Sequence, residues 1–218
     1  DGYLRHGVAA RRVLAAGNPL LYDLRRRLAD APEPRHDLLW APHWTDDWFG
    51  RRGLARWRET VPVLLDHARA VPGFRLRVRP HPLLAEAVAD TDRRDDASVA
   101  YRELVALPGV SVSDGRFLDD VVESAALLTE GVSIIAYWAA TGRPLGVVRD
   151  AESPGLNTAG EALVAAADRL DGADATRAWL DGLPHDGVDE HRRSLSELVH
   201  PTFDRSPVAI WNRDGRLG

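Results

Sequence analysis

One histidine of this chain stands between two prolines, directly after a short apolar run. Residues 74–78 are typical of a β-strand, and Arg79, Pro80, His81 and Pro82 follow them at once. The prolines restrict the backbone on both sides of the imidazole. Imidazole titrates near neutrality, and a guanidinium can bind phosphate oxygens through two hydrogen bonds. We therefore interpret His81 as a catalytic residue and Arg79 as substrate-binding, with a turn histidine as the alternative.

Polar residues follow three further predicted strands in the same way. They are His43 after 38–41; Glu130, Gly131 and Ser133 after 126–129; and Arg149, Asp150 and Glu152 after 144–148. Taken singly, each is better explained by a cap or a water contact than by a function. The carboxyl ends of parallel strands, however, meet at one edge of a sheet, where ligands bind. We therefore predict that all four loops converge on a substrate site.

The segment around Gly131 could bind an anion. It opens a predicted helix after a buried strand, and backbone N–H groups at a helix start attract negative charge. It is not a full glycine-rich phosphate motif, and an ordinary cap by Ser133 is the alternative. The loop after His43 holds two tryptophans, Trp44 and Trp48, which suit either a stacked base or packing.

Alternation of short apolar runs with amphipathic stretches predicts the elements that position these loops. Strands are expected at 38–41, 74–78, 110–113, 126–129 and 144–148, and helices at 20–28, 54–71, up to 107, 118–125, 133–140, 175–183, 189–199 and 208–211. Residues 162–167 are ambiguous between the two. The pattern indicates an α/β fold with a doubly wound parallel sheet, Rossmann-like, followed by carboxyl-terminal helices.

Composition narrows the possible functions. The 218 residues contain no cysteine, which excludes thiol chemistry, and a net charge of −5 argues against nucleic-acid binding. No apolar run approaches the roughly 20 residues of a membrane span. His185, His191 and His200 lack a tight ligand spacing, so we expect no metal and no cofactor. We expect one soluble, cytoplasmic domain over residues 1–218 and, because it begins at Asp1, a fragment.

Several short segments resemble a known family and occur in the family's order. Residues 2–6 look like its Gly-x-Pro-Arg-Asn/Asp, 39–44 like Leu-Tyr-Ala-Pro-Thr-Trp, 79–82 like Lys-x-His-Pro, 129–134 like Thr-Asp-Tyr-Ser-Ser-Ile and 141–145 like Thr-Gly-Lys-Pro-Leu. Over roughly residues 1–150 the chain resembles the carboxyl-terminal half of the CDP-glycerol glycerophosphotransferases, the teichoic-acid polymerase and primase type with a GT-B fold. Glu130, Gly131 and Val132 depart from the family's Asp, Tyr and Ser, and Tyr137 stands where an aspartate is usual.

The resemblance implies a function for the chain and its partners. The family's signature histidine is functional, and that role carries over to His81. A complete enzyme would transfer glycerol phosphate, or a related polyol or sugar phosphate, from a CDP-activated donor to a cell-wall polymer, without a metal. This chain would be the donor half, binding a nucleotide diphosphate, with the lipid-linked or polymeric acceptor held by an absent amino-terminal half. A cytoplasmic location follows, and contact with the inner face of the membrane stays open for the full-length protein.

A second resemblance supports an alternative. Residues 147–154, followed by Gly160, resemble non-hydrolysing UDP-N-acetylglucosamine 2-epimerases, which are GT-B-like and bind a nucleotide sugar in this region. Residues 132–137 lack the small residues and the acidic pair of the epimerase pattern. A degenerate nucleotide-binding module without turnover is the third alternative.

Overall fold

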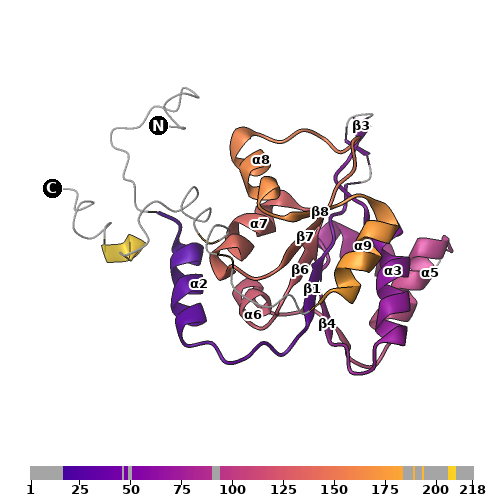
Figure 1. Ribbon diagram of the computed structural model, residues 1–218, viewed down its shortest axis with the longest axis horizontal. Helices are drawn as coiled ribbons and strands as arrows, with labels where there is room; N and C mark the ends of the chain where they lie inside the picture. The colour runs from indigo at the N-terminus through magenta and orange to yellow at the C-terminus, as the bar shows by residue number, and fades with distance from the viewer. Residues whose placement is uncertain are drawn as a thin grey trace.

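A six-stranded parallel sheet forms the centre of the protein (Figure 1). The computed structural model describes residues 17–45, 47–48, 51–89, 94–183, 189, 193 and 206–209. The strands are β1 (Leu38–Ala41), β4 (Leu76–Val78), β5 (Val110–Val112), β6 (Leu127–Thr129), β7 (Leu145–Val148) and β8 (Asp168–Leu170). They lie in the order β5-β4-β1-β6-β7-β8, and every neighbouring pair is parallel. The predicted α/β class with a Rossmann-like parallel sheet is confirmed.

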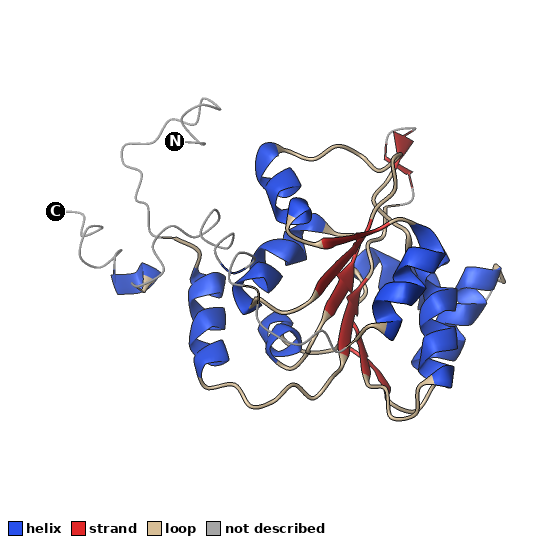
Figure 2. Ribbon diagram, viewed as in Figure 1, coloured by secondary structure: helices blue, strands red, loops and turns tan. Residues whose placement is uncertain are grey.

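Helices cover both faces of this sheet (Figure 2). One face carries α2 (Pro19–Ala29), α6 (Phe117–Val122), α7 (Val132–Trp138) and α8 (Thr158–Ala165), and the other carries α3 (Trp57–Ala70), α4 (Pro82–Ala89), α5 (Asp96–Val105) and α9 (Gly172–Asp181). Side chains alternate along β1, so that Leu39 packs on the first face and Trp40 on the second, both fully buried. Each face therefore has its own hydrophobic core, and the sheet is doubly wound.

Local chemistry explains where the helices begin and end. The Asn18 side chain accepts hydrogen bonds from the first turn of α2, and Pro19 occupies its first position. Asp95 caps α5 in the same way through the Ser98 N–H. After α7 a short 3-10 turn (η1, Ala139–Thr141) ends at Gly142, whose positive φ of 68° suits glycine. The signals at Asn18-Pro19 and at Gly142 lie within the sequence itself, which is why the start of α2 and the end of η1 were predictable, whereas no start was predicted for α5.

Four parts of the fold were missed or left open by the sequence prediction. Helix α4 begins at Pro82, where the sequence predicted only a loop, and the ambiguous segment 162–167 lies mostly in α8. Strand β8 was not predicted, because it has three residues and only Leu170 is buried. The antiparallel hairpin of β2 (Asp47–Trp48) and β3 (Arg51–Arg52), which follows β1, was also missed.

The terminal predictions cannot be compared with the structure. Residues 2–6 and most of the helices expected at 189–199 and 208–211 lie outside the described residues. None of the described helices is long and apolar enough to cross a membrane.

Candidate functional site

A cavity of about 550 Å³ opens at the carboxyl edge of the sheet. The chain runs from β1 outward to β4 and β5, then returns and continues from β6 to β7 and β8, so the winding reverses between β1 and β6. Ligands of open α/β sheets bind in the crevice at such a reversal. The cavity is lined by Ala41, Pro42, His43, Arg79, Pro80, His81, Pro82, Ala85, Val112, Ser113, Asp114, Gly115, Phe117, Thr129, Gly131, Ser133, Ile134 and Tyr137. The loops after β1, β4 and β6 therefore converge as predicted, together with the loop after β5.

His81 is fixed by the start of α4. Its backbone N–H donates to the Pro42 carbonyl at 3.3 Å, which ties the loop to the end of β1. Its Nδ1 accepts from the Leu83 backbone N–H at 3.3 Å, so the imidazole caps the helix. With Nδ1 accepting, the neutral ring carries its proton on Nε2. The site thus holds a histidine in a defined orientation with a donor to offer.

His43 is held by the same kind of contact as His81. Its Nδ1 accepts from the Thr45 backbone N–H at 3.2 Å, and its ring centroid lies 5.7 Å from that of His81. Burial lowers the pKa of His43, and the nearby His81 lowers it further. His43 is therefore neutral at pH 7, and its Nε2 carries the proton. Trp44 stacks beside this pair, with its ring centroid 6.2 Å from His43 and 5.7 Å from His81.

Arg79 lies on the cavity wall and is anchored through one nitrogen. Its Nη1 donates to Asp120 Oδ2 at 2.6 Å, to Ser113 Oγ at 3.0 Å and to the Gly115 carbonyl at 3.4 Å. Within the described part of the chain, all its hydrogen bonds run through Nη1. The other two nitrogens of the guanidinium remain available to a ligand.

Gly131 forms the N-cap of α7, and no side chain caps this helix. A cap by Ser133 is therefore wrong, because Ser133 lies inside the first turn and lines the cavity instead. A Cβ at position 131 would lie 3.4 Å from His43 Cδ2, which is an ordinary contact distance, so the His43 loop packs directly beside this helix start. No acidic residue stands in the first turn of α7, and this suits an anion.

Glu130 occupies a different place from the one predicted for a substrate-binding side chain. It is 1% exposed, does not line the cavity, and its Oε2 accepts from the His43 backbone N–H at 2.9 Å. Glu130 thus holds the His43 loop against β6, and its effect on a ligand would be indirect.

The loop after β7 does not join the other loops. Asp150 is paired with the buried Arg56 of the α3 N-terminus, Nε to Oδ2 at 3.1 Å, and both contact Ser153. Arg149 is buried and donates to the Pro154 carbonyl, and Glu152 is exposed. None of Arg149, Asp150 and Glu152 lines the cavity, so their predicted part in substrate binding stays a prediction.

Sequence reasoning missed two anchoring residues. Asp120 is 2% exposed and binds Arg77 and Arg79 at once, and Arg56 is 3% exposed and fixes the loop after β7. Their local sequences give little signal, because a charged residue at a helix start usually faces solvent. Only the tertiary pairing reveals them.

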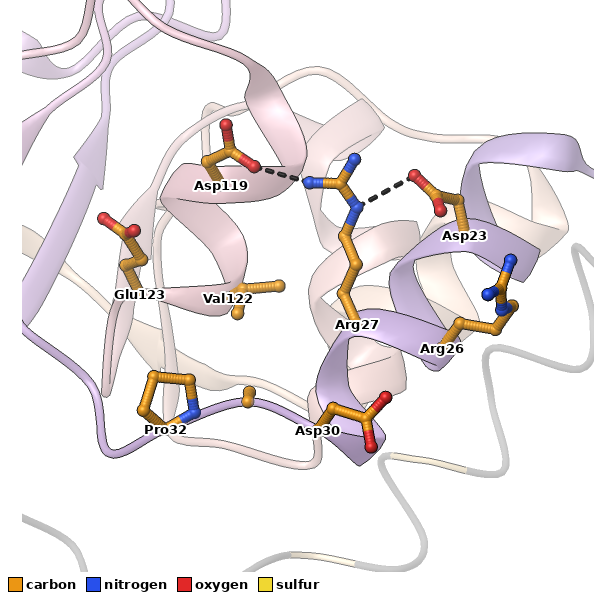
Figure 3. A pocket seen from close by; sticks show the side chains of 9 residues that line it. Asp23, Arg26, Arg27, Asp30, Pro32, Asp119, Val122 and Glu123 are labelled. Carbon is orange, nitrogen blue, oxygen red and sulfur yellow. Dashed lines mark hydrogen bonds and ion pairs between the residues drawn. The ribbon is translucent and has the colours of Figure 1, made fainter.

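A second cleft, of about 370 Å³, lies between α2 and α6 (Figure 3). Arg27 reaches across it to Asp23 of its own helix at 2.9 Å and to Asp119 of α6 at 2.5 Å. The charged side chains at the centre of this cleft are therefore paired with one another, and we do not regard the cleft as a reactive site. Over the described ranges, no group of three or more histidine or acidic side chains could hold a metal ion.

The order of the six parallel strands and the position of the cavity define the class of fold. It is a Rossmann-like α/β domain of the kind found in GT-B enzymes. No family model matches the chain, and no curated protein matches it in sequence.

Solved structures share this fold at low identity. The chain is similar to UDP-GlcNAc 2-epimerase from Neisseria meningitidis bound to UDP-GlcNAc, with TM-score 0.54, 12% identity, and coverage of 98% of this chain and 57% of that one. It is similar to the Methanocaldococcus jannaschii enzyme, with TM-score 0.51, 11% identity, and coverage of 90% and 57%. The wall teichoic acid polymerase TagF, as an H444N variant soaked with CDPG, is matched at TM-score 0.35, 15% identity, and coverage of 90% and 42%. The chain thus spans little more than half of the epimerases, and the match to TagF says nothing about function.

Proposed function

We propose that this chain binds a nucleotide-diphosphate donor in the cavity at the β1/β6 reversal, as the donor half of a GT-B transferase. The proposed donor is CDP-glycerol or a related CDP-activated polyol, as the sequence resemblance implies. The group would be transferred to a cell-wall polymer bound by a second half. An epimerase-like domain specific for UDP-N-acetylglucosamine is the second candidate, because the Neisseria meningitidis and Methanocaldococcus jannaschii epimerases match this chain at TM-scores of 0.54 and 0.51.

The observation that carries the proposal is the set of donors around the cavity. His43 and His81 both use Nδ1 as an acceptor for the backbone, so each offers an Nε2–H, and Arg79 adds a charged fork. The uncapped start of α7 lies on the same cavity. A diphosphate has the complementary chemistry, namely several acceptor oxygens and negative charge.

Binding specificity tests the proposal. Calorimetric titration of the chain with CDP-glycerol, CMP and UDP-GlcNAc should show binding selective for the cytidine ligands, with CMP weaker because it has one phosphate. Selectivity for UDP-GlcNAc would instead support the epimerase-like candidate. No binding of any of the three by a folded chain would overturn the proposed function.

Two variants of His81 separate ligand binding from helix capping. His81→Ala removes both functions, whereas His81→Asn keeps a side-chain oxygen that can cap α4 but lacks the reach of Nε2. A hydrogen bond to a charged group contributes about 1.5–3 kcal/mol, so both variants should weaken donor binding at least tenfold. Only His81→Ala should also lower stability, by about 1 kcal/mol. Ser133→Ala should weaken binding to a smaller extent, and full affinity in His81→Asn would contradict the role of this imidazole.

A further inference from the structure

Asp120 is a buried carboxylate whose two oxygens are both occupied. It lies on α6, and its side chain is 2% exposed. Oδ1 accepts from Arg77 Nε at 2.8 Å, and Oδ2 accepts from Arg79 Nη1 at 2.6 Å and from the Ser113 hydroxyl at 2.5 Å. Charge-assisted hydrogen bonds of this length are among the strongest in proteins. Asp120 therefore ties the ends of β4 and β5 to α6.

The consequence for Arg79 is a fixed guanidinium. Three acceptors hold its Nη1, and its Cζ lies 5.3 Å from the centroid of the Phe117 ring, which also lines the cavity. An arginine on the surface samples many rotamers, and ordering it for a ligand costs side-chain entropy. Here much of that ordering is complete before a ligand arrives.

The charges of the cluster also favour an anion. Arg77 and Arg79 share the single carboxylate of Asp120, so the three side chains keep one positive charge. Asp114 lies 3.7 Å from Arg77 Nη2, but its side chain is 97% exposed and solvent screens it. Arg77 does not line the cavity, so Arg79 is the residue through which this charge reaches a ligand.

We propose that Asp120 is a positioning residue, which holds Arg79 in the orientation that binds the phosphate groups of the donor. The proposal rests on the proposed function for its ligand and on the Asp120–Arg79 contact for its geometry. Asp120 itself touches no ligand, because both of its oxygens are occupied by protein donors.

A ligand-independent measurement tests the geometry. Reaction of the arginines with phenylglyoxal, followed by peptide mass spectrometry, reports how accessible each guanidinium is. Asp120→Asn should raise the rate at Arg79 several-fold, while the exposed Arg35 serves as an internal standard. Asp119→Asn is the matched control, since Asp119 is the neighbouring carboxylate on α6 and pairs with Arg27 instead. An unchanged rate at Arg79 in Asp120→Asn would overturn the proposal, whether or not the chain binds a nucleotide.

A double-mutant cycle with CDP tests the consequence for binding. Asp120→Asn and Arg79→Gln should each weaken CDP binding about tenfold, but Asp120→Asn should change it less than twofold in the Arg79→Gln chain. Additive losses would show that Asp120 does not act through Arg79. Failure of the unaltered chain to bind CDP would overturn the proposed function, and the phenylglyoxal rates would still decide the positioning role.

Arg79→Lys provides a variant that keeps Asp120 intact. Lysine has the same charge but only one nitrogen in its head group. An ammonium bound to Asp120 therefore cannot also bind a ligand through further nitrogens, as the guanidinium can. We expect Arg79→Lys to weaken CDP binding as much as Arg79→Gln. Affinity equal to that of the unaltered chain would show that charge alone is needed, and it would overturn positioning by Asp120.

Discussion

At the scale of single residues, backbone contacts fix the ring orientation of the two site histidines, His43 and His81. Both imidazoles accept a backbone N–H at Nδ1, and protonation there would break these contacts. Burial lowers the pKa of His43 and also that of His36, where the charge of Arg77 adds to the effect. The folded protein therefore resists protonation of His43 and of His36.

This resistance makes stability depend on pH. In the unfolded chain a histidine takes up a proton near its ordinary pKa of 6.5, whereas folded His43 does so only at lower pH. The unfolded state then binds more protons, so the free energy of unfolding should fall as the pH drops from about 7.5 through 6.5 and below. His43→Asn should make this fall shallower, and His36→Gln should do the same independently. Urea denaturation across this range checks the expectation, and a slope in His43→Asn equal to that of the unaltered chain would count against it.

How much of the site was predictable depended on the kind of signal each residue carries. His81 was singled out because two prolines and an adjacent arginine mark it within four residues, and His43 and Gly131 because each follows an apolar run; all three line the cavity. Asp120 was not found, because its importance depends on Arg77 and Arg79, some 40 positions earlier. Asp150 was placed at the edge of the sheet, but its partner Arg56 could not be foreseen.

At the scale of elements, the close packing of β7 is the feature most open to test. Gly146 has no side chain, and a Cβ there would lie 2.9 Å from Leu170 Cδ1, 3.1 Å from Trp179 Cε2 and 3.2 Å from Leu128 Cδ1. Helix α9 can thus pack tightly against the sheet at this point. Gly146→Ala should destabilise the protein by about 1–3 kcal/mol through overpacking.

The matched control for this prediction is Gly155→Ala, where a Cβ would meet nothing within 4 Å. That change should alter the free energy of unfolding by no more than about 0.5 kcal/mol. Thermal or urea denaturation measures both, and equal effects would contradict the packing argument. The sequence periodicity of α9 shows which side of the helix is apolar, but it does not show how close the helix lies to the sheet. That distance depends on the absence of a Cβ at Gly146 of β7.

At the scale of the whole molecule, the central sheet contributes side chains to both hydrophobic cores. β1, β6 and β7 send alternate side chains to each face, so α2 and α5 depend on the same strands although they lie on opposite sides (Figure 1). The cavity lies at the carboxyl edge of this sheet. Its loops come from four strands, and their relative positions therefore depend on the integrity of both cores.

We expect this arrangement to make the described residues unfold as one unit. Leu24 of α2 and Leu104 of α5 are fully buried in different cores, and Leu→Ala at either should cost about 2–5 kcal/mol. Each variant should lower the midpoint of one urea transition without changing its slope, because loss of either core exposes the shared sheet. Far-UV circular dichroism and tryptophan fluorescence should coincide, since Trp138 reports on one core and Trp57 on the other. A second transition in Leu24→Ala or Leu104→Ala would show instead that one layer of helices can unfold while the other keeps the cavity intact.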